Sequence, residues 1–104
     1  MSWHMLRISI EERSRDTQIK LEGRVAGPWT AELSRVWVES AARLAGKGLV
    51  LDLRGVTYAD TSATQLLCEI YEKTHAELIA GTVWTRSLAE HIKRGESQAH
   101  SGEI

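Results

Sequence analysis

The segment LVLDLRGVTYADTSA occupies residues 49–63 and joins a short, nearly continuous apolar run to a polar stretch. The run at residues 49–53 is typical of a central strand in a parallel sheet, which is buried on both faces. After a connection at residues 54–59, the apolar side chains of residues 63–73 recur at helical spacing, at Leu66, Leu67, Ile70 and Tyr71. The segment therefore predicts a buried strand followed by a helix.

The residues before this segment predict a hairpin and a first helix. Residues 5–12 alternate apolar and polar side chains, and residues 19–22 repeat the alternation after a polar turn at residues 13–16. Two such stretches predict an antiparallel hairpin with one buried face. Apolar residues then recur at helical spacing over residues 31–44, and Pro28 suits the first turn of a helix.

The residues after the segment complete the order β-β-α-β-α-β-α. Residues 78–84 predict a further strand, and residues 85–94 carry apolar side chains at helical spacing. Strand, helix and strand in succession predict parallel pairing, while the half-polar hairpin predicts that helices gather mainly on one face. We therefore expect an α/β fold with a mixed sheet. It forms one domain over residues 5–94, and the polar tail at residues 95–104 is expected to be flexible.

The predicted topology places three loops at one edge of the sheet. Loops that leave the carboxyl ends of parallel strands open on the same edge, and ligands favour that edge. Here these loops are residues 26–30, 56–62 and 85–87. We expect them to converge.

The composition narrows the class of protein. The chain has 104 residues, with thirteen basic residues against fourteen acidic ones, a balance that argues against nucleic-acid binding. The sequence has no run of 18 apolar residues, so it does not predict a membrane-spanning helix. The first residues do not resemble a secretory leader. The single cysteine, Cys68, excludes an internal disulfide and is typical of a reducing compartment. The expectation is a cytoplasmic protein.

No residue pattern predicts catalysis, a metal or a cofactor. Cys68 lies within a predicted helix and is interpreted as a packing residue rather than a nucleophile. Glu69 and Glu72 indicate a solvated helix face rather than an acid/base pair, and residues 46–48 are too short for a phosphate loop. The histidines lack metal-ligand spacing: His4, His75, His91 and His100. A small hydrolase or transferase is accordingly the least supported hypothesis.

The triplet Asp60-Thr61-Ser62 at the start of a predicted helix has two compatible interpretations. All three residues are good helix caps, and Ser62 with Gln65 matches a capping box. Alternatively, a hydroxyl in the first helical turn faces free N–H groups and the positive end of the helix dipole, where an added phosphate is tolerated. A capping hydroxyl can also be a modified one.

Two side chains near the predicted edge also have two interpretations each. Trp29, beside Gly27 and Pro28, either covers the core or anchors a partner, a role in which tryptophan is enriched. Arg86 is either an ordinary surface arginine or a cation that pairs with phosphate at the third loop.

The segment at residues 49–62 resembles the signature of STAS domains, the family of sporulation and stress anti-anti-sigma factors, also called anti-sigma factor antagonists. That signature joins an apolar strand ending in Asp-Leu to a Gly-Val step, an aromatic residue (here Tyr58) and an Asp-Ser/Thr-Ser sequence that opens a helix. The preceding hairpin and helix follow the family's order, so the resemblance covers residues 6–94 and implies a STAS-like fold.

The resemblance implies a bacterial regulatory protein that binds proteins and is not an enzyme. In the family, a partner kinase, itself an anti-sigma factor, phosphorylates the hydroxyl that follows the Asp, and the unmodified form captures that kinase. Carried over by position, Thr61 is the phosphate acceptor and the partner is an anti-sigma factor or serine/threonine kinase. The predicted partner-binding residues are Asp60, Ser62, Gly27, Pro28, Trp29, Tyr58 and Arg86.

A second hypothesis follows from the acceptor residue itself. Threonine at position 61 is more similar to stressosome scaffold members and to the STAS subunits of phospholipid transporters. The alternative function is therefore a scaffold or transporter-associated subunit without a sigma-factor role.

Overall fold

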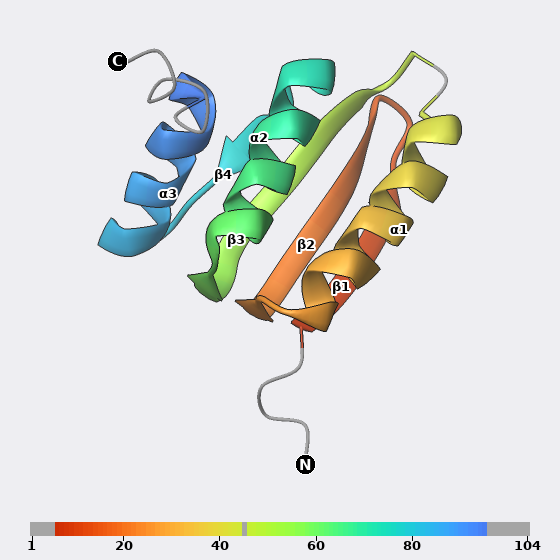
Figure 1. Ribbon diagram of the computed structural model, residues 1–104. Coiled ribbons are helices and arrows are strands. Elements are labelled where there is room, and N and C mark those ends of the chain that lie inside the picture. Colours follow the sequence, from red (N-terminus) through yellow and green to blue (C-terminus); the bar gives the residue numbers. More distant parts are fainter. Residues whose placement is uncertain (1–5, 45, 96–104) are drawn as a thin grey trace.

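The structure is a computed structural model and describes residues 6–44 and 46–95. Strands and helices follow one another in the predicted order β-β-α-β-α-β-α (Figure 1). Their bounds are β1 Leu6–Glu12, β2 Asp16–Val25, α1 Pro28–Ala42, β3 Gly48–Ala59, α2 Thr61–Thr74, β4 Glu77–Ile79 and α3 Val83–Arg94.

The strands form a mixed sheet in the order β1-β2-β3-β4. The hairpin strands β1 and β2 pair antiparallel, whereas β2 with β3 and β3 with β4 pair parallel. All three helices lie over the same face of this sheet (Figure 1). The predicted α/β class, the mixed sheet and the one-sided placement of the helices are confirmed.

The hydrophobic core lies between the sheet and the helices. Alternate residues of the two central strands point into it, namely Ile19, Leu21, Leu49, Leu51 and Leu53. The helices contribute Leu33, Trp37, Leu67, Ile70, Leu88 and Ile92. On β1, the residues between the apolar positions are exposed, so the other face of the sheet is polar at its edge, as the alternation predicted.

One carboxylate is buried within β3. Asp52 has a relative exposure of 1% and accepts hydrogen bonds from the Arg54 backbone amide and from two guanidinium nitrogens, at 2.8 to 3.1 Å. The Arg54 side chain lowers the pKa of Asp52 by hydrogen bonding, against the opposing effect of burial. The charge interrupts the apolar run without remaining unpaired.

The region after α2 differs from the prediction. The strand predicted at residues 78–84 is only Glu77–Ile79, and α3 begins at Val83 instead of Thr85. A capping box explains the early start, because the Thr82 hydroxyl accepts a hydrogen bond from the Thr85 amide at 3.0 Å and the Thr85 hydroxyl accepts one from the Thr82 amide at 2.9 Å. The helices α1 and α2 also begin earlier than predicted, at Pro28 and Thr61.

The structure does not describe the outermost residues of the predicted domain and tail. Residue 5 of the predicted domain and residues 96–104 of the predicted tail lie outside the described residues. No helix in the described ranges combines the length and apolar character needed to cross a membrane.

Candidate functional site

Two loops and one helix start meet at the carboxyl ends of the parallel strands. We call this region the C-terminal edge and define it as residues 24–30, 58–62 and 80–84. In Figure 1 it forms the lower side of the molecule, where β2 and β3 end and where α1, α2 and α3 begin. The predicted convergence holds for the first two loops, but both are shorter than predicted: residues 54–59, predicted as a connection, belong to β3, and α1 begins at Pro28. The third predicted loop, residues 85–87, is part of α3, and the loop before α3 spans residues 80–82 instead.

Asp60 joins the first two loops. One carboxylate oxygen, Oδ1, accepts a hydrogen bond from the Ala63 amide at 2.9 Å and so caps α2. The other oxygen, Oδ2, accepts a hydrogen bond from the Gly27 amide at 3.2 Å, and the Asp60 amide donates to the Val25 carbonyl at 3.2 Å. One residue therefore fixes the start of α2 against the end of β2.

The backbone at Gly27 suits this contact. Gly27 precedes α1 with φ 58° and ψ −134°, a conformation that side-chain-bearing residues rarely adopt. It directs its amide toward the Asp60 carboxylate. A glycine at this position is therefore a requirement of the backbone.

Asp60 is held as a carboxylate. Hydrogen bonds from the Ala63 amide and then from the Gly27 amide lower the pKa of Asp60, with smaller contributions from the Ser62 hydroxyl and from the charge of Arg24. A negative charge at this position also interacts favourably with the positive end of the α2 dipole.

Thr61 is the first residue of α2 and its side chain is exposed. It directly follows Asp60, so an accessible hydroxyl lies beside the carboxylate that caps the helix. The prediction that Ser62 and Gln65 form a capping box is wrong, because Asp60 is the N-cap and the third helical residue is Ala63. Three successive residues could serve as the cap, and the bond to Gly27 selects the first of them.

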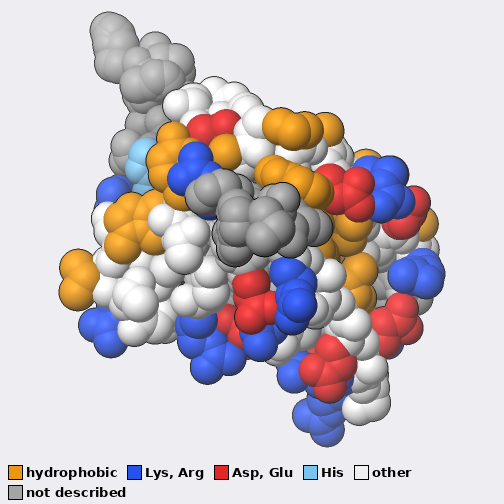
Figure 2. Space-filling view, turned by 90° about the horizontal axis from the view of Figure 1, so that it is seen from below, with side chains coloured by type: hydrophobic (Ala, Val, Ile, Leu, Met, Phe, Trp, Pro, Cys, Tyr) orange, Lys and Arg blue, Asp and Glu red, His pale blue; other side chains and the backbone are white. Residues whose placement is uncertain are grey.

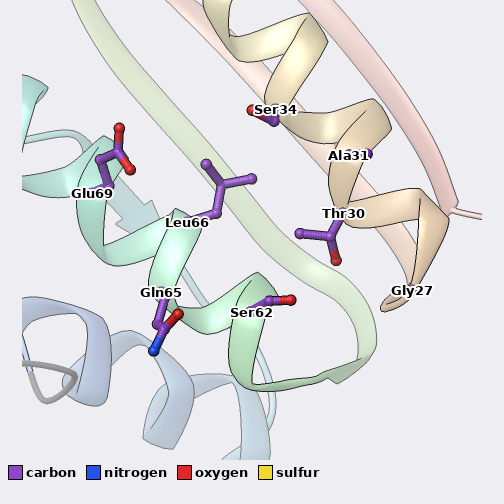
Figure 3. Close-up of a pocket in the computed structure, with 8 residues that line it drawn as sticks. All are labelled: Gly27, Thr30, Ala31, Ser34, Ser62, Gln65, Leu66 and Glu69. Carbon is purple, nitrogen blue, oxygen red and sulfur yellow. The ribbon is translucent and has the colours of Figure 1, made fainter.

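Ser62 instead lines a groove between α1 and α2. This groove has a volume of about 450 Å³ and is lined by Gly27, Thr30, Ala31, Ser34, Ser62, Gln65, Leu66 and Glu69. Figure 3 shows Thr30 and Ser62 extending into the space between the two helices. The Thr30 hydroxyl oxygen is buried and has no hydrogen-bond partner among the described residues. Thr30 was not predicted as a site residue, since an unpartnered hydroxyl has no signature in the sequence.

The other predicted partner-binding residues differ in their exposure and location. Pro28 is exposed at the start of α1, whereas Trp29 is half-buried and packs against the core, which supports its interpretation as a cover over the core. Tyr58 is 41% exposed, and the Arg24 guanidinium carbon lies 4.5 Å from the centre of its ring. Arg86 is exposed but belongs to α3 rather than to a loop, so its predicted location was wrong.

The C-terminal edge also has an exposed apolar part that was not predicted from the sequence. Val83 is 85% exposed and Trp84 is 43% exposed at the start of α3. Trp84 also lines a hollow of about 200 Å³ between α2 and α3, together with Ala59, Thr64, Ser87, Leu88 and His91. Figure 2 views the molecule from this side and shows hydrophobic side chains on its surface among polar ones. The pattern of Thr82 and Thr85 was the available signal for a helix start here.

The described residues include no group of three or more His, Cys, Asp and Glu side chains that could hold a metal ion. Cys68 is buried in α2 and unpaired, and it packs in the core as the sequence indicated.

The sequence from residue 7 to residue 80 matches the family model of the STAS domain. The chain belongs to the STAS domain family. The match spans both loops that Asp60 joins, and it confirms the resemblance inferred from residues 49–62.

The fold of this STAS domain has a counterpart among solved structures. It is similar to the crystal structure of an anti-sigma factor antagonist from Mycobacterium paratuberculosis, with a TM-score of 0.74 and 17% sequence identity over 92% of this chain and 85% of that chain. No curated protein matches the sequence significantly. The structural similarity confirms the STAS fold that the signature implied.

Proposed function

We propose that this STAS domain is a bacterial, cytoplasmic anti-sigma factor antagonist without catalytic activity of its own. It binds an anti-sigma factor or serine/threonine kinase through the C-terminal edge, and phosphorylation of Thr61 switches that binding. The observation that carries the proposal is the exposed Thr61 hydroxyl at the first position of α2, directly after the capping carboxylate of Asp60. The family and the structural similarity to an anti-sigma factor antagonist support it.

The chemistry of the switch needs only an accessible hydroxyl on this chain. The Thr61 oxygen attacks the γ-phosphorus of ATP bound to the kinase, the bond to the β-phosphate oxygen breaks, ADP leaves and a base of the kinase takes the hydroxyl proton. Thr61 then carries a charge of about −1.5 to −2 beside the Asp60 carboxylate. Two adjacent negative centres repel an acidic partner surface and are costly to desolvate, so the modified form binds the partner more weakly.

The unmodified edge offers several features that suit a protein partner. The groove between α1 and α2 places the apolar Leu66 among hydroxyl and amide groups. Trp84 adds an exposed aromatic surface at the start of α3. An apolar centre with polar surroundings is the usual composition of a protein-binding surface. Gly27, Pro28, Tyr58 and Arg86 remain predicted contacts around this surface.

The test of the proposal is phosphorylation and binding with a kinase encoded near this gene. Incubation with that kinase and ATP should label Thr61, which mass spectrometry locates, and labelling should be lost in Thr61→Ala but kept in Ser62→Ala. The wild type and Thr61→Ala should bind the unmodified partner, whereas Thr61→Asp should not. Labelling at another residue would contradict the assignment of Thr61. A stable complex with a transporter ATPase that Thr61→Asp leaves intact would support the scaffold or transporter alternative instead.

A further inference from the structure

Arg24 and Tyr58 form a cation–π pair at the ends of the two central strands. They are register partners between β2 and β3, and the Arg24 guanidinium carbon lies 4.5 Å from the centre of the Tyr58 ring. Both side chains are exposed. Within the described residues no carboxylate oxygen lies within 4.0 Å of the Arg24 guanidinium, which lies over the Tyr58 ring.

The backbone of this pair is connected to the start of α2. Tyr58 precedes Thr61 by three residues, and the Asp60 amide donates to the carbonyl of Val25, the residue after Arg24. The backbone around Arg24 is thus hydrogen-bonded to the residue before Thr61. The charge of Arg24 also contributes to the lowered pKa of Asp60, after the amides of Ala63 and Gly27 and the Ser62 hydroxyl. The guanidinium therefore acts electrostatically on Asp60, the residue before Thr61.

We propose that Arg24 is the counter-ion of a phosphate on Thr61 and leaves the Tyr58 ring for it when Thr61 is modified. The inference rests on the proposed phosphorylation of Thr61. A solvent-exposed cation–π contact is weaker than a charge-assisted, bidentate pair of a guanidinium with a phosphate, and arginine suits that geometry. Once Arg24 moves, the face of Tyr58 is uncovered. The modified and unmodified edges then differ in shape as well as in charge.

Other charged groups near the start of α2 either act on a phosphate at Thr61 or are already paired. Asp60 repels the phosphate, whereas the free N–H groups of α2 attract it. Glu32 on α1 is paired with Arg35 of the same helix, and Glu69 on α2 with Lys73. Arg86 on α3 is the cation that the sequence placed near the phosphate. Arg24 and Arg86 are therefore the two candidates that an experiment has to separate.

The experiment uses the full chain with phosphothreonine incorporated at position 61 during translation, so that no kinase is needed. ³¹P NMR titration measures the second pKa of the phosphate in the otherwise wild-type protein and in Arg24→Gln, Arg86→Gln and Arg43→Gln. Arg43 follows α1 at the opposite end of the molecule, where it lies 3.8 Å from Glu12, and its replacement changes the net charge equally. Arg24→Gln should raise the phosphate pKa by roughly half a unit, and the other two variants should leave it unchanged. An unchanged value in Arg24→Gln, or a shift only in Arg86→Gln, would overturn the proposal.

A second NMR measurement follows the Tyr58 ring directly. In the unmodified protein the side-chain CH₂ protons of Arg24 should be shifted upfield by the ring current, and Tyr58→Leu should abolish that shift. With phosphothreonine at position 61 the protons should return toward the values seen in Tyr58→Leu. An upfield shift that persists in the phosphorylated protein would show that Arg24 stays on the ring and would contradict the exchange. If both measurements succeed but no kinase labels Thr61, the counter-ion role stands and the proposed function fails.

Discussion

Asp60 and Gly27 are 33 residues apart in the chain, yet one oxygen of the Asp60 carboxylate accepts a hydrogen bond from the Gly27 amide nitrogen at 3.2 Å while the other oxygen caps α2. The two contacts connect the loop before α1 to the first turn of α2. The position of the Thr61 hydroxyl relative to the groove between these helices therefore depends on one carboxylate. Its removal should affect stability and the geometry of the proposed switch together.

Asp60→Ala should lower the free energy of unfolding by about 1–2 kcal/mol, because loss of an N-cap costs about 1 kcal/mol and the Gly27 amide also loses its partner. Urea unfolding followed by circular dichroism measures the change. The matched control is Ser62→Ala, which should stay within about 0.5 kcal/mol of the wild type because Ser62 is exposed and is not the cap. A larger loss in Ser62→Ala than in Asp60→Ala would contradict the assignment of the cap.

The lowered pKa of Asp60 predicts a pH dependence of stability. Hydrogen bonds from the Ala63 and Gly27 amides favour the carboxylate, so the folded protein holds the pKa of Asp60 below its unfolded value of about 3.9. The contribution of Asp60 to stability is therefore fully present above that value and is lost as the pH falls through the folded pKa. The difference in free energy of unfolding between wild type and Asp60→Asn should be constant above about pH 5 and shrink below about pH 4.

Asp52 titrates in the same acidic range, because the Arg54 side chain lowers its pKa. Both proteins keep Asp52, so its effect cancels in the difference. Urea unfolding of the two proteins at a series of pH values supplies the measurement. A difference that grows with acidification would contradict the direction of the Asp60 shift.

The central strands were predictable because the burial of their side chains follows a local periodicity in the sequence. The alternation of the hairpin and the apolar run at residues 49–53 depend on which side chains face the core; the structure buries Ile19, Leu21 and the run, whereas Ile10 on the edge strand is 38% exposed. The start of α3 was not predictable in the same way, because Val83 and Trp84 favour strands by propensity while the hydroxyls of Thr82 and Thr85 decide in favour of a helix. The wrong location predicted for Arg86 follows from the wrong predicted start of α3.

The cap of α2 shows a different limit of sequence reasoning. Asp60, Thr61 and Ser62 are all competent caps, and the local pattern with Gln65 favoured Ser62. The hydrogen bond from Gly27 to Asp60 decides between them, and it joins segments far apart in the chain. A contact of that range leaves no periodic signal. The unpartnered Thr30 hydroxyl and the cation–π pair of Arg24 with Tyr58 were missed for the same reason.

The positive φ of Gly27 predicts a selective effect of alanine at this position. Gly27→Ala should lower the free energy of unfolding by about 1–2 kcal/mol, since an L-residue is strained at φ 58°. The added methyl group would meet nothing within 4 Å, so the loss comes from the backbone alone. The control is Gly48→Ala, where the space is equally open and φ is not positive, and it should change stability by less than about 0.5 kcal/mol. Equal losses in the two variants would contradict backbone strain as the cause.

The buried Thr30 hydroxyl predicts a stabilising substitution that leaves partner binding unchanged. Thr30→Val keeps the shape of the side chain and removes a hydroxyl that has no hydrogen-bond partner among the described residues, so the free energy of unfolding should rise by up to about 1 kcal/mol. Because that oxygen is buried, it is not accessible to a partner in the groove between α1 and α2, so the affinity for the unmodified partner should stay the same. Urea unfolding and isothermal titration calorimetry measure the two effects.

The control for Thr30→Val is Ser40→Ala. Ser40 also has a buried hydroxyl without a recorded partner, but it lies in the last turns of α1 and does not line the groove. Ser40→Ala should be close to neutral or slightly stabilising and should leave partner affinity unchanged. A loss of stability in either variant would contradict the absence of a hydrogen-bond partner for that hydroxyl, and a loss of affinity in Thr30→Val alone would contradict the inaccessibility of its hydroxyl to a partner in the groove beside Ser62.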